Sequence, residues 1–160
     1  MTEDLGQVKY VACLQLIHGV VAAWEQKSAE NSPKNLRTFF VARQRKAMLE
    51  RDLAWFGISQ PDNQRPVLPE MNDDASLLGA MYVMEGSTLG GQYIARHVEK
   101  ILNLTDGNGN AYFRGYQQQT GLMWKESCEM LRTKVLDSDA EIAIDSAKAM
   151  FSVFGSWMRQ

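Results

Sequence analysis

The sequence has few of the features that mark several common classes of protein. It holds only two cysteines in 160 residues, and they form neither a CxxC pair nor a metal-ligand spacing. No apolar run approaches the roughly 18 residues that a membrane span needs. The net charge is −2, so electrostatics gives no reason to expect binding to nucleic acid or to an anionic membrane.

The sequence also opens without the charged and apolar pattern of a secretory signal peptide. We therefore expect a cytoplasmic protein whose thiols are reduced. Cys13 lies in an apolar helical stretch, where core packing is a more common role for a cysteine than nucleophilic attack. The short basic run at 43–46 (Arg-Gln-Arg-Lys) is followed closely by Glu50 and Asp52. We interpret this run as a solvated helix face.

Helical periodicity extends from end to end, and the alternation typical of strands is nearly absent. The pattern predicts a single all-α domain over residues 1–160. Helices are expected over about 5–26, 33–56, 73–104, 111–135 and from 137 onward. Three of the four prolines fall in 58–72, which predicts a loop there. The last helix is expected to bury one apolar stripe, formed by Ala147, Met150, Phe151, Phe154 and Met158.

Glycine is concentrated in the helix predicted over 73–104. Gly79, Gly86, Gly90 and Gly91 all lie inside it, although each costs about 1 kcal/mol relative to alanine in a helix interior. Because Gly86 and Gly90 are four residues apart, they share a face and open a groove without side chains. Such a groove suits either close packing and a kink, or a flat ligand that approaches the backbone.

The residues around these glycines resemble a known motif. The run 82–92 (Tyr-Val-Met-Glu-Gly-Ser-Thr-Leu-Gly-Gly-Gln) is similar to the distal-helix motif of bacterial haem oxygenases, the biliverdin-forming type associated with bacteriophytochromes. The similarity continues in the family's order over most of the chain. The further matching segments are Tyr10 to Glu25, Arg51 to Gly57, Trp124-Lys125 with Leu131, and Met150 to Gly155.

The resemblance implies a multi-helix haem oxygenase fold with a glycine-kinked distal helix. In that family haem lies between the distal helix and a proximal helix whose histidine binds iron. By residue matching, Gly86 and Gly90 would contact haem, Gly91 would form the kink, and Tyr82 would line the haem site. Ser87 stands where the mammalian branch has a catalytic aspartate, so Gly86, Ser87 and Gly90 would order water and dioxygen.

The implied reaction is the oxidative cleavage of haem to biliverdin, carbon monoxide and iron with dioxygen. Haem would be both substrate and cofactor, and the electrons would come from an external ferredoxin-type or flavoprotein donor. Lys148 matches a lysine that contacts a haem propionate in the mammalian branch. A solvated lysine on a helix surface is the alternative interpretation.

The family's proximal helix, of the form Leu-x-x-x-Thr-x-x-x-His-x-x-Leu-Glu, has no counterpart before Tyr10. We expect either that the sequence begins downstream of the protein's true start or that this helix has been lost. Of the two histidines, His18 is expected to be partly buried and His97 to be solvated, and neither matches the family's iron ligand. Because loss of a helix uncovers an apolar face, we expect a homodimer through that face or a rearranged first helix.

Two other functions stay open at this point. A degenerate relative would hold haem or another tetrapyrrole without turning it over, and an all-α scaffold would act only through interactions. Related folds also carry thiamin-degrading chemistry, which uses a cysteine nucleophile. Cys13 has no evident base partner in the sequence, and that chemistry would leave the glycine motif unexplained.

Overall fold

The computed structural model describes residues 2–160, with side chains from residue 6 onward, and no strand occurs in that part of the chain. The helices are α1 (Thr2–Asn31), α2 (Arg37–Val41), α3 (Lys46–Trp55), α4 (Asp74–Leu102), α5 (Ala111–Arg114), α6 (Thr120–Lys134) and α7 (Ala140–Trp157). The predicted all-α class is confirmed. Within the same residues, no helix combines the length and the apolar character that a membrane crossing requires.

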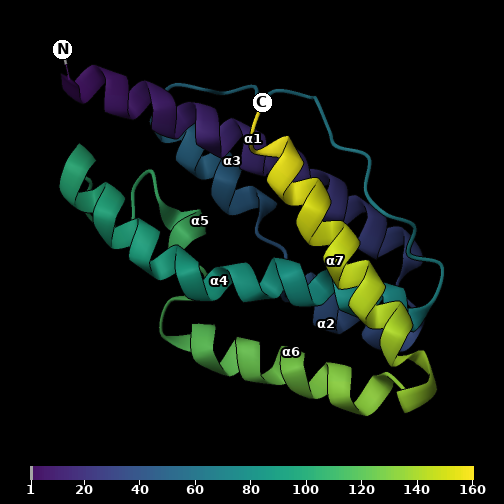
Figure 1. The fold of residues 1–160 in the computed structure, drawn as a ribbon. Helices are drawn as coiled ribbons and strands as arrows, with labels where there is room; N and C mark the ends of the chain where they lie inside the picture. Colours follow the sequence, from purple (N-terminus) through teal and green to yellow (C-terminus); the bar gives the residue numbers. More distant parts are fainter. Residues whose placement is uncertain (1) are drawn as a thin grey trace.

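The other helices are arranged around α4 (Figure 1). α7 crosses α4 and α6 packs alongside it, while α1 and α3 lie next to each other on the side away from α6. Every residue from Ala75 to Met81 is buried, so the first part of α4 forms the centre of the core. Figure 1 also shows that α4 changes direction along its length.

Two of the predicted helices are interrupted. The segment expected to be one helix over 33–56 is divided by a turn at 42–45, between α2 and α3. The helix expected over 111–135 stops at Gly115, which has a φ of +59°, and starts again at Thr120 as α6. Both predictions of a continuous helix are wrong because side chains distant in sequence stabilise the interruptions.

Two carboxylates cap helices to which they do not belong. Glu25 of α1 accepts the backbone N–H of Lys46 at the start of α3, at 2.8 Å. Asp52 of α3 accepts the backbone N–H groups of Ala111 and Tyr112 at the start of α5, at 2.8 and 2.9 Å. A carboxylate in this position satisfies N–H groups that have no partner inside the helix and interacts favourably with the helix dipole. Glu25 and Asp52 therefore fix the places where α3 and α5 begin.

We expect Asp52→Asn to lower the free energy of unfolding by about 2 kcal/mol, because one buried N–H loses its acceptor and the other bond loses its charge. Asp52 is fully buried, so water does not replace it, and burial raises the pKa of its carboxyl. Urea denaturation at one pH measures the change. Asp62→Asn, at an exposed position of the 58–72 loop, is the control and should stay within about 0.5 kcal/mol of the wild type. Equal midpoints for both variants would contradict the capping role.

Candidate functional site

An open apolar hollow of about 430 Å³ lies where α7 crosses α4, and we call it the outer hollow. It is lined by Tyr82, Val83, Gly86 and Ser87 of α4 and by Phe151, Phe154 and Gly155 of α7. Phe151 is 72% exposed, so the prediction that it is buried is wrong. Its neighbour Met150 faces the core, and one residue further along a helix turns the side chain by about 100°, which places Phe151 at the rim.

A second hollow of about 290 Å³ adjoins the first and shares Ser87 and Phe154 with it; we call it the inner hollow. Its other lining residues come from three helices (α1, α4 and α5), from the turn before α3 and from the end of the chain: Tyr10, Cys13, Ile17, Arg45, Thr88, Gly91, Ile94, Tyr112, Phe113 and Met158. Most of these side chains are apolar or aromatic. Arg45 is the charged residue among them, and it is only 3% exposed.

The glycines of α4 have different structural roles. A methyl group on Gly79 would overlap the carbonyl oxygen of Ala143 in α7, and one on Gly91 would lie 2.8 Å from the carbonyl oxygen of Phe113 in α5. These two glycines permit close helix packing. A methyl group on Gly86 would make an ordinary contact with Trp124 at 3.4 Å, and one on Gly90 would meet nothing within 4 Å. Packing therefore accounts for Gly79 and Gly91 and leaves Gly90 without a structural reason.

The hydroxyl groups next to these glycines bond to their own helix. Ser87 Oγ donates to the Met84 carbonyl at 2.6 Å, and Thr88 Oγ1 donates to the Glu85 carbonyl at 2.6 Å. Ser87 lines both hollows, so its oxygen lone pairs stay free to accept a hydrogen bond there. Ser87 is thus a hydrogen-bond acceptor at the boundary between the two hollows.

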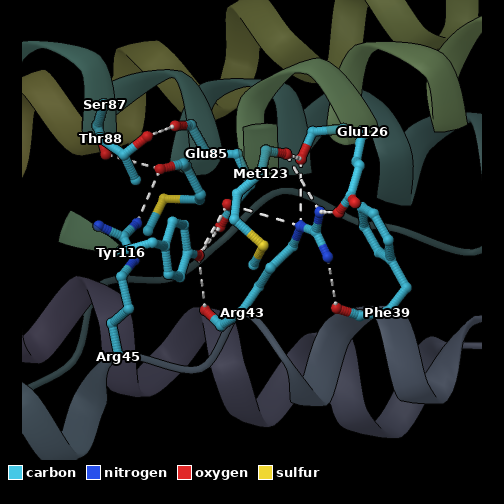
Figure 2. A network of polar contacts seen from close by, with 11 residues as sticks. Phe39, Arg43, Arg45, Glu85, Ser87, Thr88, Tyr116, Met123 and Glu126 are labelled. Atoms are coloured by element: carbon cyan, nitrogen blue, oxygen red, sulfur yellow. Dashed lines mark hydrogen bonds and ion pairs between the residues drawn. The ribbon is translucent and has the colours of Figure 1, made fainter. Parts of the chain in front are cut away.

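A buried network of polar and charged side chains joins α4 to α2, α6 and the turn before α3 (Figure 2). Arg43 is 7% exposed and holds α2 against α6. Its guanidinium donates to the Phe39 and Met123 carbonyls at 3.2 and 3.1 Å, and to the Glu126 carboxylate at 3.1 Å. The guanidinium also stacks 3.7 Å from the centre of the Phe39 ring, a favourable cation–π geometry.

Glu85 connects this cluster to Arg45. Tyr116 Oη donates to the two Glu85 oxygens at 3.0 and 2.8 Å, and Arg43 Nε lies 3.8 Å from Glu85 Oε2. Arg45 Nη2 donates to the Met84 carbonyl at 2.9 Å, and its guanidinium lies 4.8 Å from the centre of the Tyr112 ring. Figure 2 shows Arg45, from the turn before α3, and Tyr116, from the segment before α6, reaching toward the part of α4 that carries Glu85.

Burial dominates the protonation of this cluster. It raises the pKa of Glu85, while the guanidinium of Arg45, the hydrogen bond from Tyr116 and the guanidinium of Arg43 act in the opposite direction. Burial also raises the pKa of Tyr116 well above its ordinary value. Tyr116 therefore stays a neutral donor to Glu85 at physiological pH.

The interpretation of the basic run 43–46 as a solvated helix face is wrong. Arg43 and Arg45 are buried and fall in the turn between α2 and α3. The buried carboxylate near them, Glu85, lies 42 and 40 residues away in the sequence, so the local charge pattern gives no sign of their burial. The sequence does contain one indication that Arg43 and Arg45 are buried, which is Glu85 inside the glycine motif. A charged residue in a buried helix segment needs a partner of opposite charge.

The two histidines and Lys148 lie outside both hollows. His18 is expected to be partly buried, and it is in fact almost fully buried, with an exposed fraction of 3%. Its Nε2 lies 3.3 Å from Glu50 Oε1, and its Nδ1 has no hydrogen-bond partner. His97 is exposed, as predicted, and Lys148 is exposed on α7. Among the described residues no group of three histidine, cysteine or acidic side chains forms a candidate metal site.

The fold and the site define an all-α protein with two adjoining apolar hollows alongside a glycine-rich helix. A family model described as heme oxygenase matches residues 1–160. The chain therefore belongs to the haem oxygenase family. Comparison with curated proteins gives no match, and comparison with solved structures gives none.

Proposed function

We propose that this protein binds haem on the Gly86–Gly90 face of α4 and cleaves it oxidatively to biliverdin, carbon monoxide and iron. Bound haem would supply the iron at which dioxygen reacts, and an external ferredoxin-type or flavoprotein donor would supply electrons. The observation that carries the proposal is Gly90. It lies in a helix interior, where glycine is costly, and no neighbouring atom requires it.

The residues at this face suit a flat apolar ligand. Gly86 lines the outer hollow, and Gly90, one turn further along α4, is exposed and lines neither hollow. Tyr82 and Phe151 offer aromatic surface at the outer hollow, with exposed fractions of 46% and 72%. Exposed aromatic groups next to an open hollow are typical of ligand sites. Ser87 would accept a hydrogen bond from water at the boundary of the inner hollow.

The side chains at the hollows supply no imidazole for iron. Neither His18 nor His97 lines a hollow among the described residues. We therefore assign neither histidine a role in iron binding. This observation favours the second candidate function, in which the chain holds haem or another tetrapyrrole without turnover.

Titration of the purified protein with haemin tests both candidates. We expect a Soret band that saturates at a fixed ratio of haemin to protein, followed by biliverdin absorption when a reductant and oxygen are added. His18→Phe and His97→Ala should leave the Soret band unchanged, because both side chains lie away from the hollows. A stable Soret band without biliverdin would favour the binding role. Absence of saturable haemin binding would exclude both functions.

A further inference from the structure

The inner hollow has an unusual combination of an apolar lining and one buried cation. Ile17, Ile94, Phe113 and Phe154 form much of its wall, and Arg45 lines it as well. A guanidinium is always charged at physiological pH, and moving such a charge out of water is costly unless it is paired. The hydrogen bonds that Arg45 makes with other residues therefore decide whether its guanidinium has N–H groups left to bind a ligand in the hollow.

The protein satisfies Arg45 only in part. In the segment of the chain that the structure describes, its side chain makes one hydrogen bond, from Nη2 to the Met84 carbonyl. The rings of Tyr112 and Tyr116 lie 4.8 and 5.8 Å from the guanidinium carbon. A guanidinium carries several further N–H donors, and here they belong to a side chain that lines a cavity.

The carboxylates of Glu85 and Glu25 act on Arg45 electrostatically and contribute to raising its pKa, but their hydrogen bonds are made with other groups. Glu85 accepts two contacts from Tyr116 and lies beside Arg43. Glu25 accepts backbone N–H groups at the start of α3. Neither carboxylate forms an ion pair within 4 Å of Arg45 among the described residues, so the remaining donors of Arg45 are free to bind an acceptor in the hollow.

We propose that the inner hollow binds a slender apolar monocarboxylate, such as a medium-chain fatty acid, whose carboxylate pairs with Arg45. The volume of about 290 Å³ lies at the lower end of the range for small-molecule sites, which favours a narrow ligand over a large ring system. The carboxylate would form charge-assisted hydrogen bonds with the guanidinium. The alkyl chain would lie against the isoleucine, phenylalanine and methionine side chains.

The test is calorimetric titration of the haem-free protein with octanoate and with octanol, which has the same chain and no charge. Octanoate should bind about tenfold or more tightly than octanol, since hydrogen bonds to charged groups are the stronger ones. Affinity should increase about fourfold for each methylene from hexanoate upward until the hollow is full. Equal binding of octanoate and octanol, or no saturable binding of either, would overturn the proposal.

Variants locate the ligand. Arg45→Met should remove the preference for octanoate over octanol, and Lys46→Met is the matched control, because Lys46 is the next residue and does not line the inner hollow. Cys13→Phe should fill the hollow and abolish octanoate binding. If Arg45→Met does not fold, the comparison of the two ligands in the wild type still decides. A protein that bound haemin but not octanoate would overturn this inference and leave the proposed haem function intact.

Discussion

Replacing Gly90 with alanine is expected to stabilise the haem-free protein by up to about 1 kcal/mol, the difference in helix propensity between the two residues. The same change should weaken haem binding by about tenfold or more, a loss of about 1.4 kcal/mol or more in binding free energy. A methyl group at Gly90 meets no protein atom within 4 Å, but it would hold a flat ring away from the helix. A gap of a fraction of an ångström already removes much of the dispersion energy.

The control for this variant is Gly121→Ala in α6. Gly121 is also exposed, and a methyl group there also meets nothing within 4 Å. This variant should gain helix stability and leave haem affinity unchanged. Thermal unfolding and haemin titration measure the two quantities for each protein. If Gly90→Ala binds haemin as tightly as Gly121→Ala does, the Gly86–Gly90 face is not the haem site.

Replacing Glu85 with leucine is expected to lower the free energy of unfolding by about 3–5 kcal/mol, because it removes the buried carboxylate that lies 3.8 Å from the buried guanidinium of Arg43. Glu85→Gln should cost less, since its amide oxygen still accepts the Tyr116 hydroxyl. The comparison of the two variants separates the charge from the hydrogen bond. Urea denaturation curves at one pH provide the measurement.

A double-mutant cycle tests the coupling directly. Arg43→Met combined with Glu85→Leu should be less destabilised than the sum of the single changes, because it removes both members of a buried pair. Glu126→Gln is the control, since Glu126 contacts the same arginine but its side chain is 52% exposed. It should cost less than about 1 kcal/mol. Additive effects of Arg43→Met and Glu85→Leu would contradict the network of Figure 2.

The sequence predicted the existence of the helices better than their continuity. The helix expected over 73–104 is α4 almost to the residue, and the loop expected over 58–72 lies between α3 and α4. Helical periodicity is visible locally because each backbone bond joins residues four apart. The interruptions near Arg45 and Gly115 were not visible, because Glu25 stabilises the first from 21 residues away, while Glu85 and Gln92 bind residues of the second from 31 and 25 residues away.

The candidate site was predicted only in part for a similar reason. The motif around Gly86 directed attention to α4, which lines both hollows, and the family match confirms the resemblance that the motif indicated. Arg45 was wrongly interpreted as solvated, because the residues next to an arginine in the sequence do not show whether its side chain is buried or exposed. Phe151 was misplaced because the width of a buried stripe depends on which helices cover it.

The glycine-rich run of α4 is thus where sequence and tertiary structure contribute different information. The sequence by itself determined the all-α class, the position of this helix and the resemblance to the family. Only the tertiary structure separated Gly79 and Gly91, which neighbouring backbones require, from Gly90, which they do not. The physical reason is that a glycine's role depends on which atoms would meet its missing side chain, and those atoms come from α5, α6 and α7.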